Sequence, residues 1–227
     1  MEWFYSILFL IILLLCVAGA VYFFYRAIRL FIIRKIRRGV VYLILSLLLG
    51  FIVFFVISAV IGAREYSRRC LCGNNLKQIT LFVKMYASDH QEMYSSTLNG
   101  LTGDYLKTGD KEVLVCPSSH HKSGALTNIH EWTDYAYVSG LTDGDPSGCV
   151  VAFCLPENHK GEGANVAFIG MCIQWYSCQP YKDSTGQHQP TFQELTNTPS
   201  LFYGTTDEAK LADLKKRTRI IYPKSCR

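Results

Sequence analysis

The sequence lacks most of the motifs by which an enzyme or a nucleotide-binding protein is recognised. Gly-x-Ser-x-Gly, His-Glu-x-x-His, the P-loop and Gly-x-Gly-x-x-Gly are all missing from its 227 residues. Charged residues are also scarce, at 18% against 49% hydrophobic residues, which is too apolar for a disordered chain and too poor in charge for an ordinary soluble surface. These absences disfavour a soluble enzyme of a common class.

An excess of positive charge is missing from most of the chain. The formal net charge is +5, but residues 1–63 hold six of the 23 basic side chains and one of the 18 acidic ones. Residues 64–227 therefore hold 17 of each, and their charges sum to zero. A nucleic-acid-binding domain would carry its basic excess on the globular part, so we expect no nucleic-acid partner.

Two long runs, 3–25 and 40–63, contain no charged residue. At about 1.5 Å per helical residue, each is long enough to cross a hydrocarbon core of roughly 30 Å. The first run has no basic residues before it and is too long for the apolar core of a signal peptide, so we predict that it is retained. Residues 1–63 are therefore predicted to form a two-helix membrane anchor, with the lipid bilayer as a partner.

The loop between the two runs, 26–39, carries six basic side chains and no acidic one. Short loops rich in Lys and Arg stay in the cytoplasm. Arg64, Arg68 and Arg69 after the second run reduce this bias without reversing it. We expect a double-pass protein with both termini, and the domain after residue 63, on the extracytoplasmic side.

Eight of the nine cysteines follow residue 63, an even number at a density typical of disulfide-bonded domains in oxidising compartments. We expect at least two disulfides among residues 70–226, with Cys72–Cys116 as the favoured pair, because both cysteines belong to apolar segments expected to pack together. Eight cysteines allow 105 pairings, so the full connectivity stays open. The disulfide candidates are Cys72, Cys116, Cys149, Cys154, Cys172 and Cys178.

A metal site is the alternative use of these cysteines. Cys116 is followed closely by His120 and His121, with His130 further on, and thiolates and imidazoles are zinc ligands. However, the sequence has no Cys-x-x-Cys pair, and structural zinc sites usually show tightly spaced, repeated ligands. From the spacing alone we expect no metal and no cofactor.

Residues 64–92 are predicted to continue the second membrane helix, because no proline occurs between Val40 and Gln91. Apolar residues also recur in this segment at spacings of three and four, as on one face of a helix. The stripe comprises Cys72, Leu76, Ile79, Val83 and Tyr86.

Strands are expected after this helix. Residues 93–148 are rich in Gly, Ser, Thr and Asp and predict loops with two short strands, at 113–115 and 135–138. Around Ile169-Gly170 we expect a tight hairpin in which Gly170 supplies a positive φ. Three further strand-like runs are 149–154, 165–168 and 172–176.

The predicted fold class is therefore α+β. It has two N-terminal transmembrane helices, the second continuing into an amphipathic helix that packs on a small antiparallel sheet. Residues 64–180 are expected to form the outer domain, and residues 181–227 a C-terminal extension. Acidic residues 207–208 and basic residues 215–217 suit the two ends of a helix dipole, which predicts a short helix in the extension.

Three segments of the outer domain resemble the bacterial pseudopilin-like, prepilin-type family of type II secretion systems. They are the helix motif Cys-Gly-Asn-Asn-Leu-Lys-Gln-Ile at 72–79, the Cys-Pro pair at 116–117, and the late hairpin from Pro156 to Gly170. The resemblance implies a pilin-like fold and a place in a bacterial inner membrane with a periplasmic domain. Its motif positions are Asn75, Leu76, Lys77, Gln78, Pro117, Asn158, His159 and Gly170.

The chain departs from the family pattern in two places. The late signature has a His, nine residues, then Asp-Gly, but here His159 is followed by Ile169-Gly170, so the aspartate is lost. The basic run before Gly39 resembles a prepilin leader, yet the Glu expected at the fifth position after the cleavage site is Ile44. We therefore treat Gly39 as a degenerate cleavage position and expect it to stay uncut.

The resemblance implies a structural or assembly subunit of an envelope or secretion apparatus, with other pilin-like or secretion-system membrane proteins as partners. We do not expect an enzyme. One alternative is an extracytoplasmic ligand-binding or sensing module that uses the loops of 93–148. A less favoured alternative is a Cys-His hydrolase built on Cys116 with His120, His121, His130 or His159.

Overall fold

The computed structural model describes residues 14–15, 17–29, 36–183 and 186–224. The chain divides into two compact units, Met1–Glu65 and Tyr66–Arg227, and each is described by itself. Most of the first apolar run, the centre of the basic loop, Cys16 and Cys226 lie outside the described residues. The predictions made for them are therefore not tested here.

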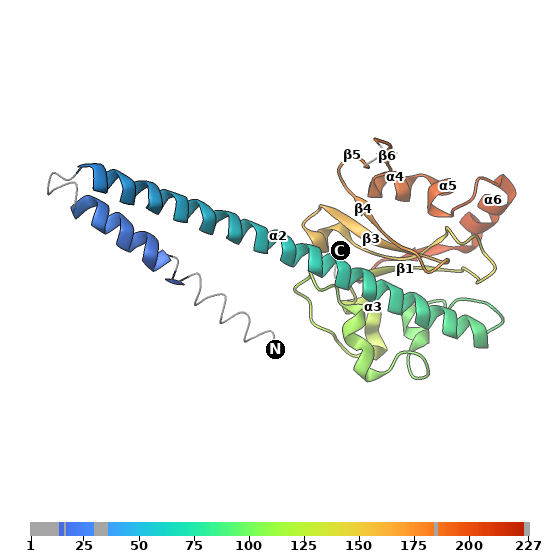
Figure 1. Cartoon of the computed structure of the whole chain (residues 1–227). Helices are drawn as coiled ribbons and strands as arrows, with labels where there is room; N and C mark the ends of the chain where they lie inside the picture. The colour runs from blue at the N-terminus through green and yellow to red at the C-terminus, as the bar shows by residue number, and fades with distance from the viewer. Residues whose placement is uncertain (1–13, 16, 30–35, 184–185, 225–227) are drawn as a thin grey trace. The chain divides into compact units, whose positions relative to one another are not determined.

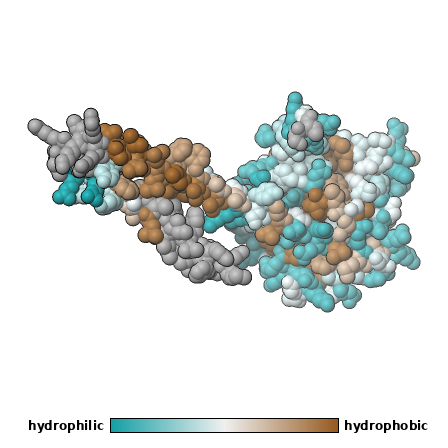
Figure 2. Space-filling view, viewed as in Figure 1, coloured by the Kyte–Doolittle hydropathy of each residue, from teal (hydrophilic) through white to brown (hydrophobic). Residues whose placement is uncertain are grey.

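The first unit holds the beginning of α2 (Ile36–Asp89), a helix of 54 residues. Within the described residues, one helix is long and apolar enough to cross a membrane, and it spans Gly39–Asp89. Its apolar side chains between residues 40 and 61 are largely exposed, for example Leu47 at 66% and Phe51 at 62%. Figure 2 shows this part of the helix as a continuous hydrophobic surface, which is compatible with a membrane anchor.

Helical residues 17–29 contact the start of α2 within the first unit. The rings of Phe23 and Tyr42 stack with their centroids 6.0 Å apart, and Ser46 Oγ donates to the carbonyl of Ala20 at 3.5 Å. Gly39 lies inside α2 and is buried. These contacts join residues on either side of the basic loop.

The second unit is built on a five-stranded antiparallel sheet with the order β4-β3-β2-β1-β7 (Figure 1). Every residue of β2 and β3 is buried, so both faces of the central sheet are covered. The strands are β1 (Tyr135–Ser139), β2 (Val150–Cys154), β3 (Gly163–Phe168), β4 (Ile173–Ser177) and β7 (Arg219–Ile221).

The C-terminal part of α2 packs on this unit through the predicted stripe. Cys72, Leu76, Ile79 and Val83 are all completely buried. Tyr86, the fifth stripe residue, is partly buried and packs against the core. The predicted amphipathic helix is therefore confirmed, and it ends at Asp89 rather than residue 92.

Short helices from the C-terminal segment cover the other side of the sheet (Figure 1). Successive strand residues point to opposite faces, so Phe153 in β2 points away from Cys154 and meets Phe192, with ring centroids 5.5 Å apart. Leu214 is also buried. These helices are α4 (Phe192–Asn197), α5 (Pro199–Phe202) and the predicted α6 (Glu208–Arg217).

The segment 181–227 also contributes strands. β7 pairs with β1 at the edge of the main sheet, while β5 (Tyr181–Lys182) and β6 (His188–Gln189) form a separate hairpin. The C-terminal extension is thus part of the same compact unit as the sheet.

Two local predictions were wrong. Residues 113–115 do not form a strand, because Val113 and Leu114 end a 3-10 helix, η2 (Thr108–Leu114). The β3–β4 hairpin is present, but the positive φ belongs to Met171 at 61°, not to Gly170. Gly170 instead lies close to Ser147, since an added Cβ would lie 3.2 Å from the Ser147 carbonyl oxygen, which is a tight contact.

The remaining short helices belong to the loop-rich stretch or follow β2. Four residues separate Cys154 at the end of β2 from His159, the last residue of η4. The remaining short helices are η1 (Leu98–Leu101), η3 (Leu126–Asn128), α3 (Ile129–Trp132) and η4 (Pro156–His159).

The packed face of α2 predicts a position-dependent loss of stability. Leu76→Ala should lower the free energy of unfolding by about 2–5 kcal/mol, because it opens a cavity under a fully buried side chain. Leu81→Ala makes the same change in the same helix at a residue that is 47% exposed, and its effect should stay within about 0.5 kcal/mol. Urea unfolding of the detergent-solubilised full chain, followed by tryptophan fluorescence, measures both. Equal effects would contradict the packing.

Candidate metal centre

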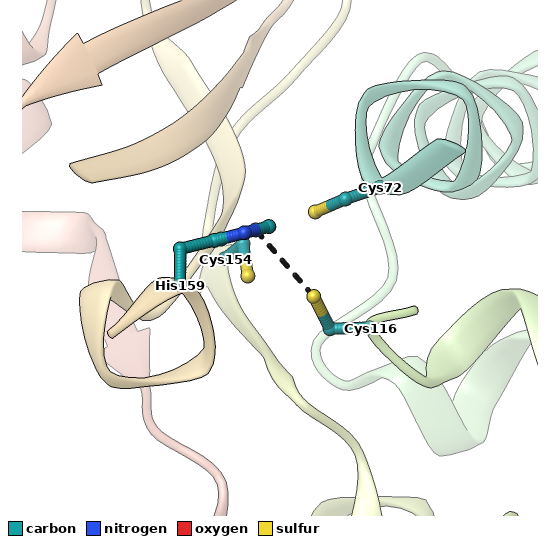
Figure 3. Close-up of side chains that lie close together, drawn as sticks. All are labelled: Cys72, Cys116, Cys154 and His159. Atoms are coloured by element: carbon teal, nitrogen blue, oxygen red, sulfur yellow. Dashed lines mark hydrogen bonds between the residues drawn. The ribbon is translucent and has the colours of Figure 1, made fainter. Parts of the chain in front are cut away.

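Three cysteines and one histidine from four separate segments meet inside the second unit. Cys72 comes from the stripe of α2, Cys116 from the loop after η2, Cys154 from the end of β2, and His159 from η4. Their sulfur and ring nitrogen atoms all lie within 4.8 Å of one another, and all four side chains are completely buried. Figure 3 shows the four side chains converging on one point.

Local structure places the two cluster residues that are close in sequence, Cys154 and His159. Cys154 is the last residue of β2, and Pro156 opens the single 3-10 turn of η4. Proline favours the first position of a helical turn because its φ is already fixed near the helical value. The turn ends at Lys160, which has the left-handed conformation. The chain therefore turns back after β2, and His159 lies near the end of that strand. Its Nε2 lies 3.5 Å from the Sγ of Cys116.

The loop that carries Cys116 is held by hydrogen bonds on both sides. Asn75 of α2 donates through Nδ2 to the carbonyl of Val115 at 3.0 Å. Thr133 donates through its hydroxyl to the carbonyl of Leu114 at 2.9 Å. The amide of Cys116 itself donates to the buried carboxylate of Asp134 at 2.8 Å. The position of this sulfur is therefore set by partners in α2 and in the two residues that precede β1.

Asp134 joins this loop to two further polar groups. Ser119 donates to the same carboxylate at 2.5 Å, and Nδ1 of His121 lies 2.5 Å from its other oxygen. The carboxylate is completely buried, whereas the His121 side chain is 44% exposed. A buried carboxylate needs such hydrogen-bond donors, which explains the role of Ser119 and His121 beside Cys116.

Two of the three sulfur atoms accept a hydrogen bond from a neighbouring side chain. The hydroxyl of Tyr135 donates to Cys72 Sγ at 3.6 Å, and Asn158 Nδ2 donates to Cys154 Sγ at 3.5 Å. Tyr135 and Cys154 are direct cross-strand partners in β1 and β2. The cluster is thus lined by donors suited to sulfur that carries negative charge.

The thiols are not electrostatically equivalent. Hydrogen bonds from Cys116 and Cys154 lower the pKa of Cys72 to about 4, although burial opposes the shift. Burial raises the pKa of Cys154 well above its ordinary value, and its hydrogen bonds to Cys116 and Cys72 add to that rise. The protein alone therefore favours the thiolate at Cys72 and the neutral thiol at Cys154, because charges packed this closely repel one another.

The disulfides expected from the sequence are not supported in the described part of the chain. Cys72 and Cys116, the favoured pair, are both free. The other described cysteines are free as well, and Cys149 has a separate role in which its thiol donates to the carbonyl of Tyr203 at 2.9 Å. The free cysteines are Cys70, Cys72, Cys116, Cys149, Cys154, Cys172 and Cys178.

The histidine in the cluster is His159, and not one of the three histidines that the sequence suggested for a metal site. His120, His121 and His130 are exposed, whereas His159 is completely buried. The sequence did single out all four residues of the cluster, but for other reasons. Cys72, Cys116 and Cys154 were disulfide candidates, and His159 was a motif position. Their distances along the chain gave no reason to group them.

Several positions of the pseudopilin-like motifs gather at this cluster. Asn75 donates a hydrogen bond to the loop before Cys116, and Asn158 donates one to the sulfur of Cys154. Leu76 is buried one helical turn after Cys72, and Pro117 directly follows Cys116. Lys77 and Gln78 are exposed instead, and Gly170 lies in the β3–β4 turn.

Comparison with protein-family models, curated proteins and solved structures found no match for this chain. The pseudopilin-like resemblance therefore remains a prediction from the motifs.

Burial predicts how the thiols react. In the native full chain, a maleimide should modify exposed Cys70 and Cys172 quickly, and Cys72, Cys116 and Cys154 only after unfolding. Because the pKa of Cys72 is lowered, this thiol would react readily if it were exposed, so its slow labelling would report burial. Peptide mapping after timed labelling distinguishes the sites. Modification of Cys72 or Cys116 as fast as Cys70 would contradict the buried cluster.

Proposed function

We propose that the chain is a membrane-anchored, pilin-like structural or assembly subunit of a bacterial envelope or secretion apparatus, and that it is not an enzyme. The observation that carries the proposal is the continuity of α2. One unbroken helix contains the exposed apolar run after Gly39 and the buried stripe from Cys72 to Val83. A helix of this kind both anchors a domain and forms part of its core.

The proposal includes two membrane-spanning helices joined by a cytoplasmic loop. Contacts of Phe23 with Tyr42 and of Ala20 with Ser46 support a helical hairpin. The basic side chains of the loop support its cytoplasmic position. The outer domain then lies on the periplasmic side of an inner membrane, and the chain remains uncut at Gly39.

A Cys-His hydrolase is the alternative favoured by one distance. Cys116 Sγ and His159 Nε2 are 3.5 Å apart, which is close to the separation of a nucleophile and its base. Both side chains are completely buried, and two further thiols share the same site. A substrate could reach this sulfur only if the helix and sheet separated, so we favour the structural role.

A ligand-binding or sensing module is supported by a separate cavity of about 410 Å³. It is lined by η1, α3, β1 and the residues at the end of β7, including Leu98, His130, Tyr137 and Tyr222. This volume falls within the range of small-molecule sites, and part of the lining comes from the loops of 93–148. The cavity keeps this function as the second candidate.

Reporter fusions test the topology. Alkaline phosphatase fused after Arg227 should be active, because the enzyme folds only outside the cytoplasm. The same reporter inserted at Arg34 should be inactive, because the basic loop stays inside. Immunoblots must show that both fusions are made in equal amounts. A stable but inactive C-terminal fusion would reverse the proposed orientation.

Site-specific photo-crosslinking tests the assembly role. A crosslinking amino acid in place of Leu47, on the exposed apolar face of α2, should capture other pilin-like or secretion-system membrane proteins in the native membrane. The same amino acid in place of Lys216, exposed on α6, serves as the matched control on the outer domain. The crosslinked products should contain the uncut chain. Capture of lipid alone at Leu47, together with ester or peptide hydrolysis by the purified protein, would favour an enzyme instead.

A further inference from the structure

We propose that Cys72, Cys116, Cys154 and His159 bind one zinc ion, and that this ion is a structural part of the second unit. This proposal differs from the expectation drawn from the spacing of the cysteines, which was that the chain binds no metal. It is also independent of the proposed assembly role, since either could hold without the other.

The positions of the donor atoms fit a tetrahedral ion. With Zn–S distances of about 2.3 Å, two sulfur ligands of a tetrahedral site lie about 3.8 Å apart. All four donor atoms already lie within 4.8 Å of one another, and Cys116 Sγ and His159 Nε2 are 3.5 Å apart. Small side-chain rotations would therefore close the four donors around one ion.

The donor types favour zinc among the common metals. Three thiolates and one imidazole form one of the standard ligand sets of structural zinc. Calcium and magnesium require oxygen ligands, and the four grouped donor atoms include none. Zinc also has no redox chemistry, so it would hold three neighbouring sulfurs without oxidising them.

Burial assigns a structural rather than a catalytic role. A catalytic zinc ion keeps one coordination position for water or substrate, whereas a structural ion has four protein ligands. Here four protein donors are present and all four side chains have no exposed surface. No coordination position then remains for a substrate.

The surroundings can accommodate the charge of such a centre. A zinc ion with three thiolates and a neutral imidazole carries one net negative charge, which is costly in a core unless hydrogen-bond donors face it. Tyr135 and Asn158 supply an O–H and an N–H to Cys72 and Cys154. Hydrogen bonds from such neighbours orient ligands and tune a metal site.

The ion would add one further link between elements that already meet through packing and a few hydrogen bonds. It would join α2, the loop after η2, the end of β2 and η4 at one point. Because such a site does not exist in an unfolded chain, the free energy of metal binding adds to the stability of the fold. The loop-rich stretch after α2, which has little regular structure, would gain a fixed attachment at Cys116.

Metal analysis of the full chain tests the proposal. The protein is extracted from membranes in mild detergent without chelator, and its metals are measured by plasma mass spectrometry. We expect one zinc per chain in the unmodified protein and less than about a tenth of that in Cys154→Ser. Cys149→Ser provides the matched control, because Cys149 is also completely buried next to β2 but lies outside the cluster, and it should keep its zinc.

Two further variants separate loss of a ligand from loss of the fold. His159→Cys replaces imidazole by a fourth thiol and should retain zinc, whereas His159→Ala should lose it. After exchange for Co²⁺, the unmodified protein and His159→Cys should both show the strong visible absorption of tetrahedral cobalt, with the bands shifted by the added thiolate. Cys149→Ser should have the unshifted spectrum.

Three results would overturn the proposal. One is equal zinc in Cys154→Ser and Cys149→Ser, which would indicate adventitious binding. Another is a metal-free protein in which peptide mapping finds a Cys72–Cys116 disulfide. The third is stoichiometric iron or copper in place of zinc. None of these results would decide the assembly role, which the crosslinking at Leu47 tests separately.

Discussion

One face of α2 has to match the sheet beneath it, and the arrangement of the second unit depends on this contact. The stripe buries Cys72, Leu76, Ile79 and Val83 completely, so the helix cannot rotate without exposing apolar side chains to water. With the rotation fixed, Asn75 reaches the loop before Cys116, while Arg69 offers its carbonyl to Asn165 of β3 at 2.8 Å. The same contact that forms the core therefore brings Cys72 to β2.

Three thiols and an imidazole occupy the core at this contact. Valine or leucine would fill the same space without polar atoms, and a buried imidazole is costly unless it has a partner. His159 has a thiol at 3.5 Å and the ring of Trp175 in an edge-to-face arrangement, with centroids 5.2 Å apart. The guanidinium carbon of Arg69 lies over the same Trp175 ring, 4.5 Å from its centroid. The polar atoms of the core thus form an organised group rather than isolated exceptions.

The parts of the fold that the sequence predicted are those determined by local patterns. The stripe on α2 recurs with helical spacing, and the β3–β4 hairpin follows from two strand-like runs close together. The pattern failed at 113–115, because three apolar residues suit the end of a 3-10 helix as well as a strand. It also placed the positive φ at Gly170, whereas the structure has Met171 in that conformation and Gly170 in a tight contact with Ser147.

The site was less predictable because it depends on tertiary contacts. The sequence paired Cys72 with Cys116 and expected their two segments to pack together, but it gave no reason to group Cys154 with them. The fourth member, His159, is joined to them only when η4 turns back beside β2. The exposed His120 and His121 are closer to Cys116 in sequence, yet His121 contacts the carboxylate of Asp134 instead. Proximity along the chain was therefore a poor guide to which histidine joins the cluster.

The order of the four residues along the chain has a consequence for biosynthesis. Cys72 and Cys116 are made before Cys154 and His159. At about 5–20 residues per second, a ribosome needs roughly 2–9 seconds to extend the chain from the second of these cysteines to the histidine. During this interval the two early thiols have only each other as partners within the future cluster. In an oxidising compartment, thiol oxidation then competes with completion of the site, and the outcome depends on relative rates as well as on the stability of the finished fold.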